Sequence, residues 1–154
     1  MINQLKSRGA SLPVVHRTGR RDVVFLGVTM NVLLTSAETG GQFSLIEGVM
    51  PPGGDGGLHV HHREDESMHL VEGELEVTIG ADRFTLRPGE SYFAPRGAPQ
   101  RLRNIGERSA RGILLTTPGG FDEFVTAAAG LAPSEPARLT EIAARFGIEI
   151  LAPR

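Results

Sequence analysis

The sequence predicts an all-β protein, a barrel of short strands with a helical extension at its C-terminus. Its 154 residues include 20 glycines and 10 prolines, whereas aromatic residues make up only 5%. Glycine and proline mark tight turns, so this composition is typical of short strands joined by turns. Apolar and polar residues alternate over much of the stretch 43–116, and after Pro118 the apolar spacing changes from two to about 3.6 residues. We therefore expect strands up to residue 117 and helices beyond it.

The predicted elements form three parts, which are an N-terminal arm at 1–21, a β-barrel at 22–117 and a helical extension at 118–154. The arm is polar and irregular. Within the barrel, apolar or alternating stretches predict strands, and stretches rich in glycine or proline predict the turns between them. The first strand region, 23–34, is expected to be continuous or to break near Gly27. Further strands are expected at 43–49, around His59 and Glu66, and at 74–79, 84–86, 92–94, 100–104 and 113–116.

Two helices are expected in the extension. The first is indicated by apolar residues at helical spacing, namely Phe121, Phe124, Val125 and Ala128. The second begins near Pro136, with Ser134 as a candidate cap, and Gly147 is its natural end. Each helix would lay one apolar stripe on the barrel.

Charge and composition exclude several classes of function. A formal net charge of -2 gives no electrostatic case for binding nucleic acid or an anionic membrane. Because the chain has no cysteine, it has no disulfide and no thiolate ligand, and any metal must be bound by nitrogen and oxygen. No stretch resembles a signal peptide or a membrane span. We expect a single-domain, cytoplasmic protein whose partner is a small molecule.

The candidate site lies in residues 53–73, which hold four of the five histidines. His59 and His61 are two residues apart, so on a strand both imidazoles project from the same face. A second strand is indicated from Glu66, where alternate residues would share one face, and Glu66 adds a carboxylate to that face. Two imidazoles and one carboxylate suit Fe(II), and Mn, Ni, Co or Zn can occupy the same set. A His-x-His pair alone is weak evidence, because in a glycine-rich loop it is more often solvated surface. By parity, His62 and His69 face away from the site.

The residues around this pair form a recognisable frame. Gly53, His59, His61, Glu66 and Gly73 fit the pattern G-x5-H-x-H-x4-E-x6-G. A second pattern, G-x5-P-x-G-x2-H-x3-N, is matched at every position but one by Gly89, Pro95, Gly97 and Asn104. In both patterns the chain resembles the cupin superfamily, and its flanks are similar to small bacterial cupins of the quercetin 2,3-dioxygenase type. The resemblance implies a double-stranded β-helix, or jelly-roll barrel, with one or two C-terminal α-helices.

The resemblance also implies a site. One divalent metal ion, Fe, Mn, Ni, Co or Zn, would be bound by His59, His61, Glu66 and Gln100. Glu66 would also be catalytic, by accepting the proton of a substrate hydroxyl group. An apolar, open-ended cavity would bind the substrate through Met68, Leu70, Phe93 and Leu102. The resemblance to small cupins of this type also implies a homodimer, with the N-terminal arm as a contact between subunits.

Gln100 stands where the family has its third histidine. An amide offers a carbonyl oxygen, which is a harder and weaker donor than imidazole, or an NH2 group that cannot bind a metal. Three alternatives remain open at this point. Gln100 binds the metal through oxygen, or hydrogen-bonds a metal-bound water, or marks a barrel that no longer binds metal.

Three functions follow from these alternatives. The first is a metal-dependent dioxygenase that acts on a flavonol-like or other enolic or aromatic substrate. The second is a non-redox cyclase or isomerase, in which the ion acts only as a Lewis acid. The third is a cupin that binds a small molecule without catalysis. Since one fold hosts many chemistries, the sequence alone does not choose among them.

Overall fold

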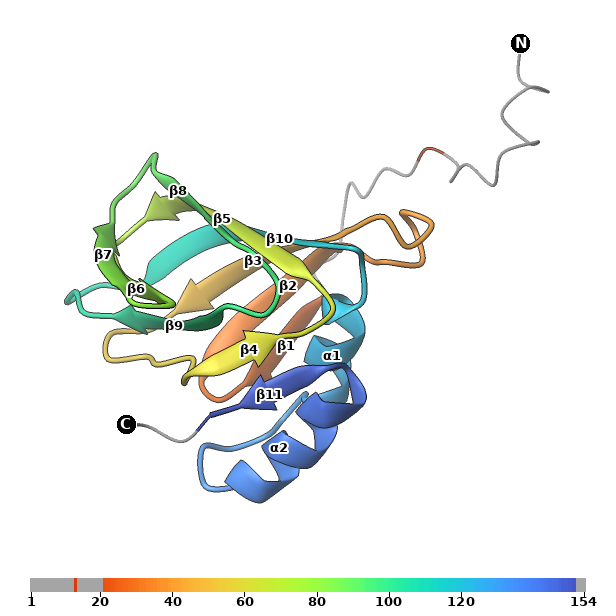
Figure 1. Cartoon of the computed structure of the whole chain (residues 1–154). Coiled ribbons are helices and arrows are strands. Elements are labelled where there is room, and N and C mark those ends of the chain that lie inside the picture. The colour runs from red at the N-terminus through yellow and green to blue at the C-terminus, as the bar shows by residue number, and fades with distance from the viewer. Residues whose placement is uncertain (1–12, 14–20, 152–154) are drawn as a thin grey trace, which may run out of the picture.

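The computed structural model describes residue 13 and residues 21–151, which form two antiparallel sheets that face each other (Figure 1). This arrangement confirms the predicted all-β architecture with C-terminal helices. The predicted arm lies outside the described residues except for Pro13 and Arg21, so its role in a homodimer stays a prediction. Among the described residues, no helix is long and apolar enough to cross a membrane.

The larger sheet has six strands in the order β1-β2-β3-β10-β5-β8. Their bounds are Asp22–Phe25 for β1, Val28–Leu34 for β2, Ser44–Met50 for β3, Ala110–Thr117 for β10, Asp65–Glu72 for β5 and Ser91–Ala94 for β8. Leu26 and Gly27 both have positive φ angles and break the first predicted strand into β1 and β2. In the centre of the sheet, Ile46 on β3 opposes Leu114 on β10, and both side chains are buried.

The smaller sheet has five strands in the order β11-β4-β9-β6-β7. Their bounds are Ile148–Ile150 for β11, His59–His61 for β4, Pro99–Asn104 for β9, Leu75–Ile79 for β6 and Asp82–Leu86 for β7. Apolar and polar residues alternate on β6, and the apolar residues Leu75 and Val77 are buried between the sheets, as the sequence indicates. Strand β11 was not predicted. It is only three residues long, which is too short for a periodic signal to appear.

Two helices close one end of the sandwich, beside β1 and β11 (Figure 1). They are α1, Phe121–Ala127, and α2, Pro136–Arg145. Their buried side chains join a core cluster with residues of both sheets, among them Phe25, Ile46, Leu114 and Ile148. A second cluster fills the opposite end of the sandwich and includes Leu70, Val77, Leu86 and Leu102. The helices therefore pack on the barrel through apolar faces, as the spacing of their apolar residues predicts.

The cap expected at Ser134 is wrong. The residue that precedes α2 is Glu135, because Pro136 occupies the first turn of the helix. No side chain caps the first turn, and the Glu135 carboxylate instead accepts a hydrogen bond from the amide of Ala132 at 3.1 Å. At the other end the prediction holds, since Gly147 follows the helix with a φ angle of +72°.

Two glycines with similar backbone angles allow a sharp test of this fold. Gly73 has a φ angle of +81°, and a Cβ atom there would lie 2.6 Å from the Cα atom of Ala110. Gly89 has a φ angle of +88°, and a Cβ atom there would meet nothing within 4 Å. Gly73→Ala is expected to lower the free energy of unfolding by about 3 kcal/mol, and Gly89→Ala by only about 1 kcal/mol. Urea denaturation measures both, and equal losses would contradict this account.

Candidate metal centre

The two sheets meet at three candidate ligands. His59 and His61 lie on β4 of the smaller sheet, and Glu66 lies on β5 of the larger one. One ligand atom from each of the three lies within 4.8 Å of the others. The two imidazole rings contact each other edge to face, with their centroids 5.1 Å apart. The structure thus brings together the two imidazoles and the carboxylate, and it places both imidazoles on one face of β4 as their spacing predicts.

Each imidazole is oriented by a contact on the side away from the site. The Nδ1 atom of His59 lies 2.9 Å from the carbonyl oxygen of Gly57. The Nδ1 atom of His61 lies 3.3 Å from a carboxylate oxygen of Glu64, which is itself buried. If each Nδ1–H donates to its oxygen, each Nε2 atom keeps its lone pair for the site, which is how metal-binding histidines are held in proteins.

The carboxylate of Glu66 is held on both of its oxygens. One oxygen lies 3.2 Å from Nε2 of His61. The other accepts a hydrogen bond of 2.6 Å from the hydroxyl group of Tyr92, which reaches it from β8. All three side chains are buried. Sequence reasoning missed both Glu64 and Tyr92. A carboxylate three residues after His61 is a sequence signal that could have identified Glu64.

The surroundings of the site shift the pKa values of its titrating groups in different directions. Burial lowers the pKa of His59, and the nearby His61 lowers it further. For His61, burial acts in the same direction, but the flanking carboxylates of Glu64 and Glu66 outweigh it and raise the pKa to about 9. Burial would raise the pKa of Glu66, but the close contact with His61 and the charge there hold it below the ordinary value. Burial and the charge of Glu66 keep Tyr92 protonated by raising its pKa well above 10. Glu66 is therefore an ionised acceptor.

Gln100 lies beside the three ligands. It is the register partner of His59 on the neighbouring strand β9, and only 1% of it is exposed. Its Nε2 atom lies 3.4 Å from Nε2 of His59, and its buried Oε1 atom has no hydrogen-bond partner among the described residues. A half-turn of the side-chain amide exchanges these two atoms. An amide oxygen can therefore face the same point as the ligand atoms.

These residues fit a divalent ion. The donor set is two imidazoles and one carboxylate, with the side-chain amide of Gln100 beside them. Nε2 of His61 is also buried without a hydrogen-bond partner, although a Glu66 oxygen is 3.2 Å away. An unpartnered polar atom is costly in a protein interior, and an ion bound by the three ligands would satisfy Nε2 of His61. Nitrogen and oxygen donors of this kind suit Fe(II), Mn, Ni, Co or Zn.

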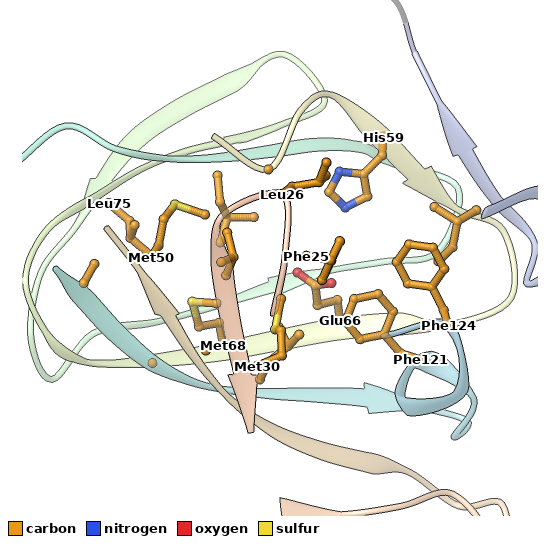
Figure 2. A pocket seen from close by; sticks show the side chains of 18 of the residues that line it. Phe25, Leu26, Met30, Met50, His59, Glu66, Met68, Leu75, Phe121 and Phe124 are labelled. Carbon is orange, nitrogen blue, oxygen red and sulfur yellow. The ribbon is translucent and has the colours of Figure 1, made fainter. Parts of the chain in front are cut away.

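An apolar cavity opens next to the site (Figure 2). With the open solvent at its mouth included, the empty space amounts to about 900 Å³. Among the expected substrate-binding residues, Met68 and Leu102 line it, whereas Leu70 is fully buried behind the lining. The expectation for Phe93 is corrected, because its side chain is 59% exposed on the outer face of β8. On that strand the inward positions belong to Tyr92 and Ala94, since Ala94 pairs with Glu66.

His62 and His69 face away from the site, as their parity predicts. His62 contacts Glu149 on the surface at 2.7 Å, and His69 contacts Ser91. Arg101 and Arg103 on β9 both form ion pairs with Asp55 in the loop before β4. None of these four residues lines the cavity.

Fold and site together define a small β-sandwich protein with a two-His-one-carboxylate centre. Residues 47–116 match the family described as "Cupin domain". The cupin resemblance of the two sequence patterns is thus confirmed over residues 47–116.

Named proteins are among the curated relatives of this chain. The protein "Polyketide synthase CurC" of Streptomyces cyaneus is 30% identical over 93 residues, which make up 60% of this chain and 60% of that protein. Quercetin 2,3-dioxygenase of Bacillus subtilis is 28% identical over 101 residues, which make up 64% of this chain and 29% of that enzyme. The chain thus spans less than two thirds of either relative.

Solved structures share the fold. The polyketide cyclase RemF of Streptomyces resistomycificus has a TM-score of 0.59 and 21% identity, with 69% of this chain and 79% of that chain covered. KdgF of a Halomonas species has a TM-score of 0.59 and 22% identity, with 69% and 93% covered. At these identities the similarity concerns the fold alone.

Replacing the carboxylate behind His61 tests how the ligand is oriented. Glu64→Gln keeps the shape of the side chain but removes its charge, so the Nδ1–H of His61 loses its charged acceptor. We expect the affinity for Mn or Zn, measured by calorimetric titration, to fall by about tenfold or more. Glu149→Gln is the matched control, because it alters the surface partner of His62 and should leave metal affinity unchanged. Similar affinities for both variants would contradict an orienting role for Glu64.

The role of Gln100 can be tested by restoring the residue that other cupins have there. Gln100→His would add a third imidazole beside His59 and His61. If the amide lies at a ligand position, the affinity for Ni or Zn should rise by about tenfold or more, since imidazole is the better donor for these ions. Competition with a coloured chelator measures the change. An unchanged or weaker affinity would place Gln100 outside the ligand set.

Proposed function

We propose that this protein is a metal-dependent cupin enzyme that acts on a small enolic or aromatic molecule, with dioxygenase chemistry as the leading candidate. The observation that carries the proposal is the cluster of His59, His61 and Glu66 beside an apolar cavity, which His59 and Glu66 line. The sequence similarity to quercetin 2,3-dioxygenase supports the choice of chemistry. The three ligands, with Gln100 beside them, would hold one divalent ion.

The cavity lining indicates the class of substrate. Among the described residues that line it, only His59 and Glu66 have polar side chains. A sugar or another polyol would bury hydroxyl groups without partners, at about 1–3 kcal/mol for each group. A dicarboxylate would find no cationic side chain in the lining apart from a protonated imidazole. The cavity therefore favours a mostly apolar molecule with one polar edge directed at the ligands.

Three residues around the centre would have distinct roles in the proposed reaction. Glu66 is ionised and buried, so it can accept the proton of a substrate hydroxyl group. The hydroxyl group of Tyr92 holds the other oxygen of Glu66 and so fixes the direction of the accepting lone pair. Phe121, whose ring contacts His61 edge to face, helps to keep water away from the ligands. A redox-active ion at this centre would supply electron transfer to dioxygen and Lewis acidity.

A second candidate is a non-redox cyclase or isomerase. Gln100 favours it, because an oxygen donor in place of imidazole suits a Lewis acid as well as a redox centre. The sequence similarity to the polyketide synthase CurC supports this candidate as well. In this case Glu66 would move a proton within the substrate, and dioxygen would not be consumed.

Metal analysis and one substitution test the proposal. We expect close to one equivalent of metal per chain in protein purified without added metal. With a flavonol as substrate, Glu66→Gln should abolish oxygen uptake while some metal is retained, because the amide cannot accept the substrate proton. Glu72→Gln is the control on the same strand, since Glu72 is exposed and pairs with Arg111.

The outcomes separate the three functions. Turnover that persists without oxygen would favour the cyclase or isomerase over the dioxygenase. Unchanged oxygen uptake in Glu66→Gln would remove Glu66 from catalysis. Protein that contains no metal and takes none up on reconstitution would leave a cupin that binds small molecules without catalysis.

A further inference from the structure

Two glycines lie side by side in the floor of the cavity. Gly48 on β3 and Gly112 on β10 are direct register partners, and both line the cavity. Gly48 pairs on its other side with Met30 of β2, and Gly112 pairs with Leu70 of β5. In the middle of this row across the larger sheet there is therefore no side chain at all. The bare backbone makes a shallow trough that a flat group could occupy.

Methionine side chains border this trough (Figure 2). The sulfur of Met30 lies 3.8 Å from the point where a Cβ atom of Gly48 would stand, and the sulfur of Met68 lies 3.1 Å from the corresponding point at Gly112. Methionine is unbranched and has three rotatable bonds, and its sulfur makes favourable contacts with aromatic rings. These two side chains can therefore move aside for a ring and then contact it, while the backbone stays in place.

The trough lies well away from the ligands. On β10, Gly112 lies four positions before Thr116, which is the register partner of Glu66. At about 3.3 Å per residue, the two rows are roughly 13 Å apart. Ile46 and Leu114 form the apolar row between them. A single ring with its hydroxyl group at Glu66 would end over this middle row, whereas a molecule of two or three rings would extend to the glycines.

We propose that Gly48 and Gly112, with Met30 and Met68, form a subsite for the distal ring of a flat, multi-ring substrate. Gly48 is then a specificity-determining residue that sets how long a substrate the cavity accepts. This inference rests on the proposed function for the position of the polar end of the substrate at His59 and Glu66. The distal subsite itself requires no metal.

The backbone at Gly48 makes the proposal testable. Its φ angle is not positive, and a Cβ atom there would meet only the sulfur of Met30, at an ordinary contact distance of 3.8 Å. A side chain at this position is therefore tolerated by the fold and fills the trough. Val49, the next residue on β3, points away from the cavity. Gly48→Leu and Val49→Leu are thus matched variants that place leucine on opposite faces of the same strand.

The experiment compares two probes with the same polar end. Maltol and 3-hydroxyflavone share a 3-hydroxy-4-pyranone ring, and the flavone adds a fused ring and a phenyl group. Each is titrated into the full chain by calorimetry, before and after treatment with EDTA. We expect Gly48→Leu to weaken the binding of 3-hydroxyflavone by about tenfold or more and that of maltol by less than about twofold. Val49→Leu should change neither affinity by more than about twofold.

Several results would overturn the subsite. These are an equal loss of both affinities in Gly48→Leu, no loss of either, or a wild-type protein that binds the flavone no better than maltol. If Gly48→Leu does not fold, as judged by thermal unfolding, Gly48→Ala replaces it, with an expected loss of about threefold for the flavone alone. Failure of the proposed function gives a different pattern. The protein would then lack metal and turnover but still discriminate between the two probes after EDTA treatment.

Discussion

The structure depends on one buried arrangement of charge, in which the imidazole of His61 lies between the carboxylates of Glu64 and Glu66. All three side chains are almost fully buried. Ionised groups in a protein interior are unfavourable unless each is paired, and removal of one partner costs more than the pair contributes. Because His61 belongs to the smaller sheet and Glu66 to the larger one, this pairing also fixes how the two sheets approach each other at the helical end.

The site is built from more elements than its ligands suggest. The loop before β4 supplies the carbonyl group that orients His59, β8 supplies the hydroxyl group on Glu66, and α1 supplies the ring against His61. The polar contacts gather at one end of the cavity. The opposite end is made of glycine, methionine and leucine. This division gives a bound molecule one direction, with its polar edge at the ligands and its apolar body over the larger sheet.

Much of this arrangement could be predicted from the sequence, because it depends on local periodicity. The spacing of two between His59 and His61, and the opposite parity of His62, decide which rings face the site once a strand forms. The helical spacing after Pro118 likewise gives α1 and α2. These features need only the conformation of a single strand or helix.

The features that were missed depend on which strands become neighbours. Tyr92 reaches Glu66 only because β8 pairs with β5 in a register that sets Ala94 opposite Glu66. The same register turns Phe93 outward. The sequence of β8, which is only four residues long, does not by itself show which of its side chains point inward. The trough at Gly48 and Gly112 is also a property of pairing, since the two glycines are far apart in the chain. Pairing of distant strands leaves no periodic signal in either one.

Strand β4, which carries both imidazoles, is only three residues long and pairs with β9 on one side and with β11 on the other. Of the described strands, β11 is the last to be translated. A nascent chain therefore exposes the ligand-bearing strand with one open edge long after His59 and His61 have left the ribosome. Domains usually complete folding as units once their last element is available. Closure of the centre is in this way coupled to the synthesis of β11, and a chain that stops before β11 would present its histidines on an unprotected sheet edge.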